Sequence, residues 1–158
     1  MNKNGYYGLF FEDLTVGMKI KHKLGRTVTY DDNLFFTHAQ LNSAPLHFDI
    51  EYMAMSQFGK PILVATTALM LSYGISSEEF PNIAEEISIE NLVFKTPLFH
   101  MDTIHLYSEI TGKKEVEGWD DAGLVKIHHM VKKEQGTKLI CEFDRKVMMY
   151  KSSNSPWE

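Results

Sequence analysis

The sequence is poor in cysteine, in long apolar runs and in surplus positive charge, and each shortage excludes a class of protein. Its 158 residues contain one cysteine, Cys141, so neither an intrachain disulfide nor a multi-cysteine metal site can form. No window approaches the roughly 18 consecutive apolar residues of a membrane-spanning helix. Lysine and arginine total 16 against 21 aspartates and glutamates, a formal net charge of −5. Without a basic stripe, neither a nucleic-acid nor a membrane surface is expected.

The composition is that of one ordinary soluble domain. Hydrophobic residues make up 44% of the chain and charged residues 23%, which argues against disorder. An apolar patch near the N-terminus, residues 6–11, is followed at once by Glu12 and Asp13 and by no small-residue cleavage site. Secretion is therefore not expected. With a single cysteine, the chain suits a reducing compartment, and we expect a cytoplasmic protein.

Hydrophobic spacing predicts one strand and then three helices. The strand is expected over residues 18–29, and the helices over residues 30–41, 49–59 and 61–74. Asp31 and Asp32 suit the first turn of the first helix, and Asp49 suits the N-cap of the second. The third helix begins at Pro61, is apolar on nearly every face and is expected to be buried all round. Side chains expected to pack from the first two helices are Leu34, Phe35, His38 and Leu41, and Ile50, Tyr52, Met53 and Phe58.

Four strand-like runs follow at hairpin spacing, over residues 87–95, 102–114, 123–133 and 138–150. They predict an antiparallel meander, and Cys141 is expected to face its interior. The simplest packing wraps this sheet around the apolar third helix, so the expected fold class is α+β. A polar tail over residues 152–158 is expected to be loose.

Residues 42–49, with the sequence NSAPLHFD, place one histidine close to an amide and an acid in a turn stiffened by proline. Histidine can act as a base near pH 7 and as an acid once charged, so His47 is the candidate acid–base residue. Asn42 cannot exchange a proton and can only orient water or a carbonyl group by hydrogen bonds. Asp49 is interpreted as the cap of the helix that follows.

Four segments carry a resemblance to a known family. Residues 11–18 (FEDLTVGM), 42–49, 58–61 (FGKP) and 97–103 (PLFHMDT) resemble MaoC-type enoyl-CoA hydratases of the hotdog fold. The resemblance implies a single hotdog domain over residues 1–151, in homodimers or assemblies of dimers whose active site lies near the subunit boundary. It also implies reversible addition of water to a trans-2-enoyl thioester, with coenzyme A as part of the substrate and no further cofactor.

The resemblance also assigns roles residue by residue. The family motif reads aspartate, any residue, asparagine, proline, aliphatic residue, histidine. His47 matches the catalytic histidine and Pro45 the proline, whereas Asn42 and Ala44 replace the aspartate and the asparagine. This variant resembles proteins that act on short branched or dicarboxylic acyl-CoAs such as mesaconyl-CoA. Residues assigned to substrate binding are Pro45, Lys60, Ala65 and Thr66, with Lys60 expected to reach a phosphate of coenzyme A.

Hydration of a conjugated thioester needs a base for water, a proton for the α-carbon and donors for the negative charge on the thioester oxygen. We hypothesise that His47 moves both protons on one face of the substrate while Asn42 positions the water. Backbone N–H groups at the start of the apolar helix, Ala65 among them, would supply the oxyanion donors. The side chain of Ala65, where the family generally has glycine, is expected to narrow the acyl pocket.

Other activities stay open from the residues alone. A hotdog thioesterase or acyl-carrier-protein dehydratase generally draws a carboxylate from the central helix, and residues 61–75 contain no acid, histidine, lysine or arginine. A non-catalytic acyl-CoA-binding protein stays a further alternative. No metal site is expected: His128 and His129 are adjacent in a strand and point to opposite faces, and His100 and His105 lack a metal-ligand spacing.

Overall fold

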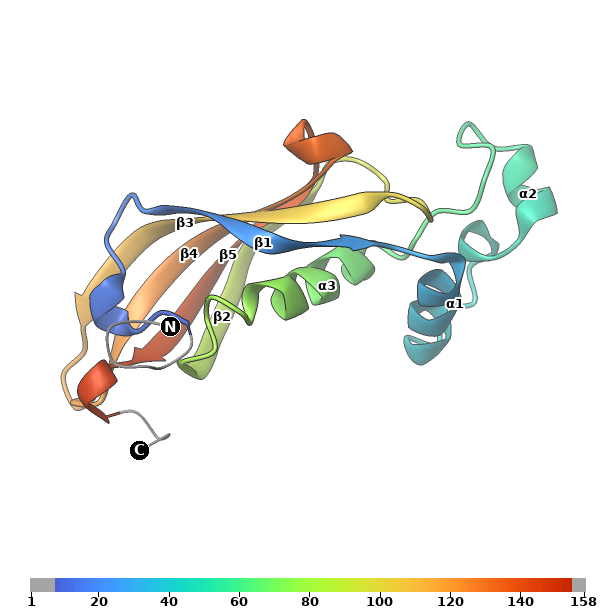
Figure 1. Ribbon diagram of the computed structural model, residues 1–158. Coiled ribbons are helices and arrows are strands. Elements are labelled where there is room, and N and C mark those ends of the chain that lie inside the picture. The colour runs from blue at the N-terminus through green and yellow to red at the C-terminus, as the bar shows by residue number, and fades with distance from the viewer. Residues whose placement is uncertain (1–7, 155–158) are drawn as a thin grey trace.

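A curved antiparallel sheet of five strands lies against helix α3 (Thr66–Ser76) in the computed structural model, which describes residues 8–154 (Figure 1). The strands are β1 (Lys19–Thr27), β2 (Ile83–Phe94), β3 (Thr103–Glu115), β4 (Ala122–Lys133) and β5 (Lys138–Tyr150). The other helices are α1 (Tyr30–Ala39) and α2 (Ile50–Ala54), and short 3₁₀ turns are η1 (Phe11–Asp13), η2 (Pro45–His47), η3 (Glu134–Gly136) and η4 (Ser152–Asn154).

The strand order is β1-β3-β4-β5-β2, with every neighbouring pair antiparallel. All five strands lie close to their predicted ranges, but the expected four-strand meander is wrong for β2, which lies at the edge beside β5. Residues 95–102 do not form a hairpin between β2 and β3, because their backbone carbonyls accept hydrogen bonds from the segments before α1 and α3. The carbonyl of Leu98 accepts the N–H of Leu63 (2.9 Å), and the carbonyl of Asp102 accepts the N–H of Val28 (2.9 Å).

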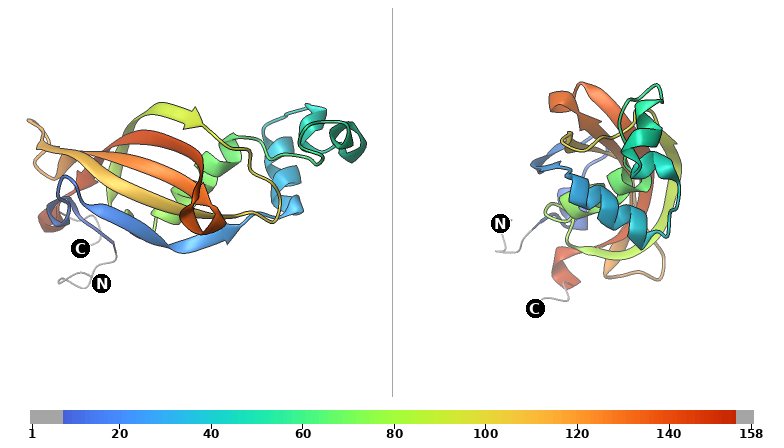
Figure 2. Two further views of the ribbon diagram at one scale, coloured as in Figure 1. Left: turned by 90° about the horizontal axis from the view of Figure 1, so that it is seen from above. Right: turned by 90° about the vertical axis from the view of Figure 1, so that its right-hand side faces the viewer.

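Helix α3 lies against the concave face of the sheet in the two views of Figure 2. The main core forms between them. Alternate residues of β3 are fully buried, which is the period of a strand with one covered face. Ala68 and Ile75 of α3 pack in the same cluster as Leu106 and Phe143. Cys141 is fully buried there, as predicted, and burial raises the pKa of its thiol to about 12.

Helix α3 differs from its prediction in two ways. It begins at Thr66 and not at Pro61, because the N–H groups of Ile62 and Leu63 bond the carbonyls of Leu46 and Leu98 and hold this segment out of the helix. It is also not covered all round: Met70 is 50% exposed. Among the described residues, the sheet covers only one face of α3. The apolar side chain of Met70, on another face, therefore remains exposed.

Helices α1 and α2 project beyond one end of the sheet (Figures 1 and 2). The predicted N-cap of α2 is confirmed, because Asp49 accepts the N–H of Tyr52 (2.9 Å). Asp31 and Asp32 lie in the first turn of α1 as predicted, and the N-cap is Thr29, which accepts the N–H of Asp32. Of the predicted apolar contacts Met53 is buried, but most of the others are wrong because these helices have little core to cover. Large predicted contact residues that are exposed instead include Phe35, Leu41, Ile50, Tyr52 and Phe58, and His38 is exposed as well.

Two smaller points concern the helix ends and the tail. Helix α2 stops at Ala54, earlier than the predicted Gly59, and buries only Met53. In the predicted tail, Ser152 begins η4 and donates its N–H to the Glu12 carboxylate (3.1 Å), while residues 155–158 lie outside the described residues. Within residues 8–154, no helix is long and apolar enough to cross a membrane.

Candidate active site

The orientation of the His47 side chain is fixed by the backbone of a neighbouring segment. His47 ends turn η2 and is 7% exposed, and its Nδ1 lies 2.8 Å from the carbonyl oxygen of Ile62. A carbonyl oxygen only accepts hydrogen bonds, so Nδ1 must carry the proton. In a neutral ring Nε2 then has a free lone pair, and no residue among 8–154 hydrogen-bonds this atom. The ring is therefore held in the form that a general base requires.

The loop that carries His47 is anchored by helix α1. Asn33 is fully buried and donates from Nδ2 to the carbonyl of His47 (2.5 Å), while its own Oδ1 accepts the hydroxyl of Thr37 (3.4 Å). Pro45 starts the turn at its first position, where a residue without N–H is suited. Asn33 was not predicted as a site residue, because its only signal in the sequence is the polar pair that it forms with Thr37, four residues on in the first helix.

Asn42 has a local structural partner. Its Oδ1 accepts the backbone N–H of Ala44 at 3.0 Å, the geometry by which asparagine stabilises a turn. The donor is an N–H, so the bonded atom must be the carboxamide oxygen and the NH₂ group points elsewhere. No hydrogen bond joins Asn42 to His47 within the described residues. The predicted role of Asn42 toward water stays a prediction.

The start of α3 lies beside the His47 loop. Ala65 is exposed, has helical backbone angles and caps α3, and its N–H bonds no acceptor in the part of the chain described. Thr66 donates its hydroxyl to Oε1 of Gln40 at the end of α1 (2.5 Å), so this hydroxyl ties two helices together. The Thr66 hydroxyl is thus engaged, whereas the Ala65 N–H is available.

An apolar cavity of about 230 Å³ opens next to this segment. Ile62, whose carbonyl holds His47, lines it together with Ala65, Ala68, Leu98 and Ile140. His47 itself does not line the cavity, so Ile62 is the link between them. Lys60 lies outside the cavity with Nζ 4.5 Å from the centre of the Phe99 ring, a cation–π distance. The cavity suits an acyl group, and Lys60 is free of carboxylate partners among the described residues.

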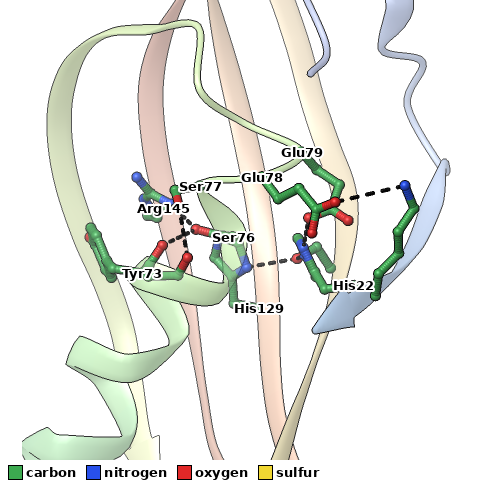
Figure 3. A network of polar contacts seen from close by, with 11 residues as sticks. His22, Tyr73, Ser76, Ser77, Glu78, Glu79, His129 and Arg145 are labelled. Carbon is green, nitrogen blue, oxygen red and sulfur yellow. Dashed lines mark hydrogen bonds and ion pairs between the residues drawn. The ribbon is translucent and has the colours of Figure 1, made fainter. Parts of the chain in front are cut away.

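A second polar cluster crosses the core at the other end of α3 (Figure 3). His22 bonds the Glu79 carboxylate through Nδ1 (2.6 Å) and Ser108 Oγ through Nε2 (2.7 Å), and Ser108 also bonds Nδ1 of His129 (2.8 Å). These distances match those of a serine hydrolase triad. However, His22, Ser108 and His129 are each 1% exposed. No substrate reaches a hydroxyl that is buried and bonded on both sides, so we assign this cluster a structural role.

Arg145 continues this cluster toward the sheet edge. Its guanidinium bonds both carboxylate oxygens of Glu86 and the Ser76 hydroxyl, and stacks 4.0 Å from the centre of the Tyr73 ring. Burial lowers the pKa of His129 well below its ordinary value, and the charge of Arg145 acts in the same direction. Burial raises the pKa of Tyr73. The cluster therefore holds a neutral histidine in the core.

His128 and His100 take no part in the hydrogen bonds of the two clusters. His128 points to the outer face of the sheet and bonds Asp144 (2.7 Å), so the prediction that it and His129 face opposite sides is confirmed. His100 meets the Tyr30 ring edge-on. Across residues 8–154, no three histidine, cysteine or acidic side chains are grouped as metal ligands.

Comparison with known proteins gives the family. A family model described as MaoC like domain matches residues 12–131. The chain belongs to the MaoC-like family. The resemblance predicted from residues 11–18, 42–49, 58–61 and 97–103 is thereby confirmed for the family as a whole.

Three relatives describe what this MaoC-like chain is similar to. The β-methylmalyl-CoA dehydratase of Chloroflexus aurantiacus is 26% identical over 125 residues, which are 79% of this chain and 36% of that protein. The chain thus spans about a third of the curated relative it matches. The solved (R)-hydratase of A. caviae superposes with a TM-score of 0.72 at 22% identity, covering 87% of this chain and 98% of that one. A Mycobacterium tuberculosis protein described as a double hotdog fold gives 0.77 at 20%, covering 92% and 45%.

These likenesses confirm the predicted fold. The five-stranded antiparallel sheet wrapped on one helix is a hotdog fold, of mixed α and β content.

Proposed function

We propose that this MaoC-like protein adds water reversibly to a short trans-2-enoyl-CoA and gives the 3-hydroxyacyl-CoA. The observation that carries the proposal is the bond from His47 Nδ1 to the Ile62 carbonyl, which leaves Nε2 able to act as a base, while Ile62 also lines the apolar cavity. The family and the Chloroflexus relative, which is named as a dehydratase of a CoA ester, support the same class of reaction.

In this mechanism His47 moves one proton twice. Nε2 takes a proton from water while the oxygen forms a bond to the β-carbon, and the electrons of the double bond move onto the thioester oxygen. The imidazolium then returns its proton to the α-carbon, and the enolate electrons form the new C–H bond. Asn33 acts as a positioning residue, because it bonds the carbonyl of His47. No carboxylate takes part.

Donors for the thioester oxygen come from the start of α3. The N–H of Ala65 is available, and the positive end of an 11-residue helix lies at this point. The methyl group of Ala65, which lines the cavity, narrows the acyl site in this proposal. The free NH₂ of Asn42 orients the attacking water. Pro45 shapes the turn, Thr66 lies at the start of α3, and Lys60 is the cation for a phosphate of coenzyme A.

We also propose that two chains pair through β2. This strand is an edge strand, hydrogen-bonded only to β5 among the described strands. Its exposed large apolar residues are Ile87, Ile89, Leu92, Val93 and Phe94. An apolar edge strand is a template for pairing with another chain. The M. tuberculosis relative, described as a double hotdog, supports such an arrangement. Light scattering should give twice the monomer mass, and a monomer for Ile89→Lys; a monomeric native protein would exclude this assembly.

One set of assays separates the hydratase from its alternatives. Hydration of crotonyl-CoA removes the absorbance of its conjugated thioester, thioesterase activity releases a free thiol, and an acyl-binding protein does neither. We expect hydration, with His47→Ala slowed by about 10²–10⁴. Asn42→Ala should be slowed less, because Asn42 moves no proton. Thiol release without loss of the double bond, or binding without turnover, would refute the hydratase.

A further inference from the structure

The floor of the acyl cavity, formed by its four most buried lining residues, provides no charged or hydrogen-bonding side chain. Leu63, Ala68, Leu98 and Ile140 line it, and each is at most 4% exposed. These residues are apolar, and Ala68 and Leu98 present only their methyl or isobutyl groups as side chains. A carboxylate placed against these four residues loses its water without gaining a donor from their side chains, which is among the most expensive burials in a protein.

One lysine, Lys95, lines the cavity, and a second, Lys133, bonds the lining residue Pro97; each has a carboxylate neighbour. Lys95 lies at the rim with its side chain 49% exposed, and its Nζ is 3.7 Å from the carboxylate of Glu142. Lys133 is buried, and its Nζ bonds Asp102 (2.6 Å) and the carbonyl of Pro97 (3.0 Å). The Lys95 charge therefore lies at the exposed side of the cavity next to Glu142, and the buried Lys133 already donates to two oxygens.

From this lining we infer that the site selects an uncharged enoyl group and rejects an acyl group that carries a free carboxylate. The inference rests on the proposed function and narrows its substrate class. It also separates this chain from its Chloroflexus relative, because a methylmalyl ester of coenzyme A retains one carboxylate. In this inference, the cavity floor determines whether the site accepts a charged acyl group, and the motif variant with Asn42 and Ala44 does not.

Two thioesters that differ in one group provide the test. Mesaconyl-CoA, with the thioester next to the methyl-bearing carbon, and 2-methyl-2-butenoyl-CoA share chain length and branching, and differ by a carboxylate in place of a methyl group. Crotonyl-CoA measures the basic activity. We expect kcat/KM for the methyl compound to exceed that for mesaconyl-CoA at least about 100-fold, a typical consequence of an unpaired buried charge. Equal values, or a preference for mesaconyl-CoA, would overturn the inference while the hydratase stands.

Substitutions of Thr96 test whether the missing charged donor in the cavity causes the preference for an uncharged acyl group. Thr96 lines the cavity, is partly buried and has no side-chain hydrogen bond with the described residues. Thr96→Lys should lower the preference for the uncharged substrate at least about tenfold by supplying a charged donor, whereas the neutral Thr96→Gln should leave the ratio within about twofold. An equal change in both variants would contradict the inference. Absence of turnover with all three thioesters would instead refute the proposed function.

Discussion

His129 should make the stability of this protein depend on pH below neutrality. Its ring is buried, and burial, helped by Arg145, lowers its pKa in the folded state well below the ordinary value. In the unfolded chain a histidine titrates near its reference pKa of about 6.5. Between the two pKa values the unfolded state binds one more proton, so the free energy of unfolding falls as the pH falls below about 6.5 and is unaffected above it.

The size of this effect follows from proton linkage. One extra proton in the unfolded state costs at most about 1.4 kcal/mol of stability for each pH unit below that value. Urea unfolding at pH 7.5, 6.5 and 5.5 measures it, with His129→Gln as the matched variant. Glutamine can still donate to Ser108 but does not titrate. The native protein should lose about 1 kcal/mol more than His129→Gln between pH 6.5 and 5.5. Equal losses would show that His129 is not held neutral.

Three further predictions follow from single contacts. Asn33→Ala leaves the buried carbonyl of His47 without its donor, so urea unfolding should show a loss of about 1–3 kcal/mol, and kcat for crotonyl-CoA should fall more than KM changes. An unchanged kcat would contradict the positioning role. Gly123→Ala would place a Cβ 2.3 Å from the Phe11 ring and should destabilise by about 1–3 kcal/mol, whereas Gly74→Ala meets no atom within 4 Å and should stabilise slightly. A stable Gly123→Ala protein would contradict this packing. The Cys141 thiol, with its pKa raised to about 12 by burial, should react with a thiol reagent only at the rate of unfolding, and fast labelling of folded protein would contradict its burial.

The sequence predicted the helices and strands better than it predicted the order of the strands in the sheet and the contacts of the helices. Strand periodicity located all five strands, and the predicted cap at Asp49 was correct because a cap depends on residues within one turn. The position of β2 at the far edge was not predicted, because hairpin spacing alone does not reveal that residues 95–102 bond the segments before α1 and α3. Apolar spacing in α1 was misread as a packing face, since it carries no information on whether a core lies beside the helix.

In the candidate site, too, residues in local motifs were predicted, whereas residues whose role depends on a distant partner were not. His47, Pro45 and Ala65 come from a contiguous motif and a helix start, and the structure places the His47 loop beside the segment that leads to Ala65. Asn33 was missed because its role depends on the carbonyl of His47, 14 residues away. The His22–Ser108–His129 chain joins three strands, and no sequence spacing could reveal it.

The stereochemistry of water addition tests the central proposal most directly. When crotonyl-CoA is hydrated in D₂O, a single histidine that moves both protons must deliver the deuterium at C2 and the hydroxyl at C3 to the same face of the double bond. NMR coupling constants of the 3-hydroxybutyryl product report this geometry. We predict addition to one face. Addition to opposite faces would require a second acid across the substrate, and His47 as the sole proton carrier would then be wrong.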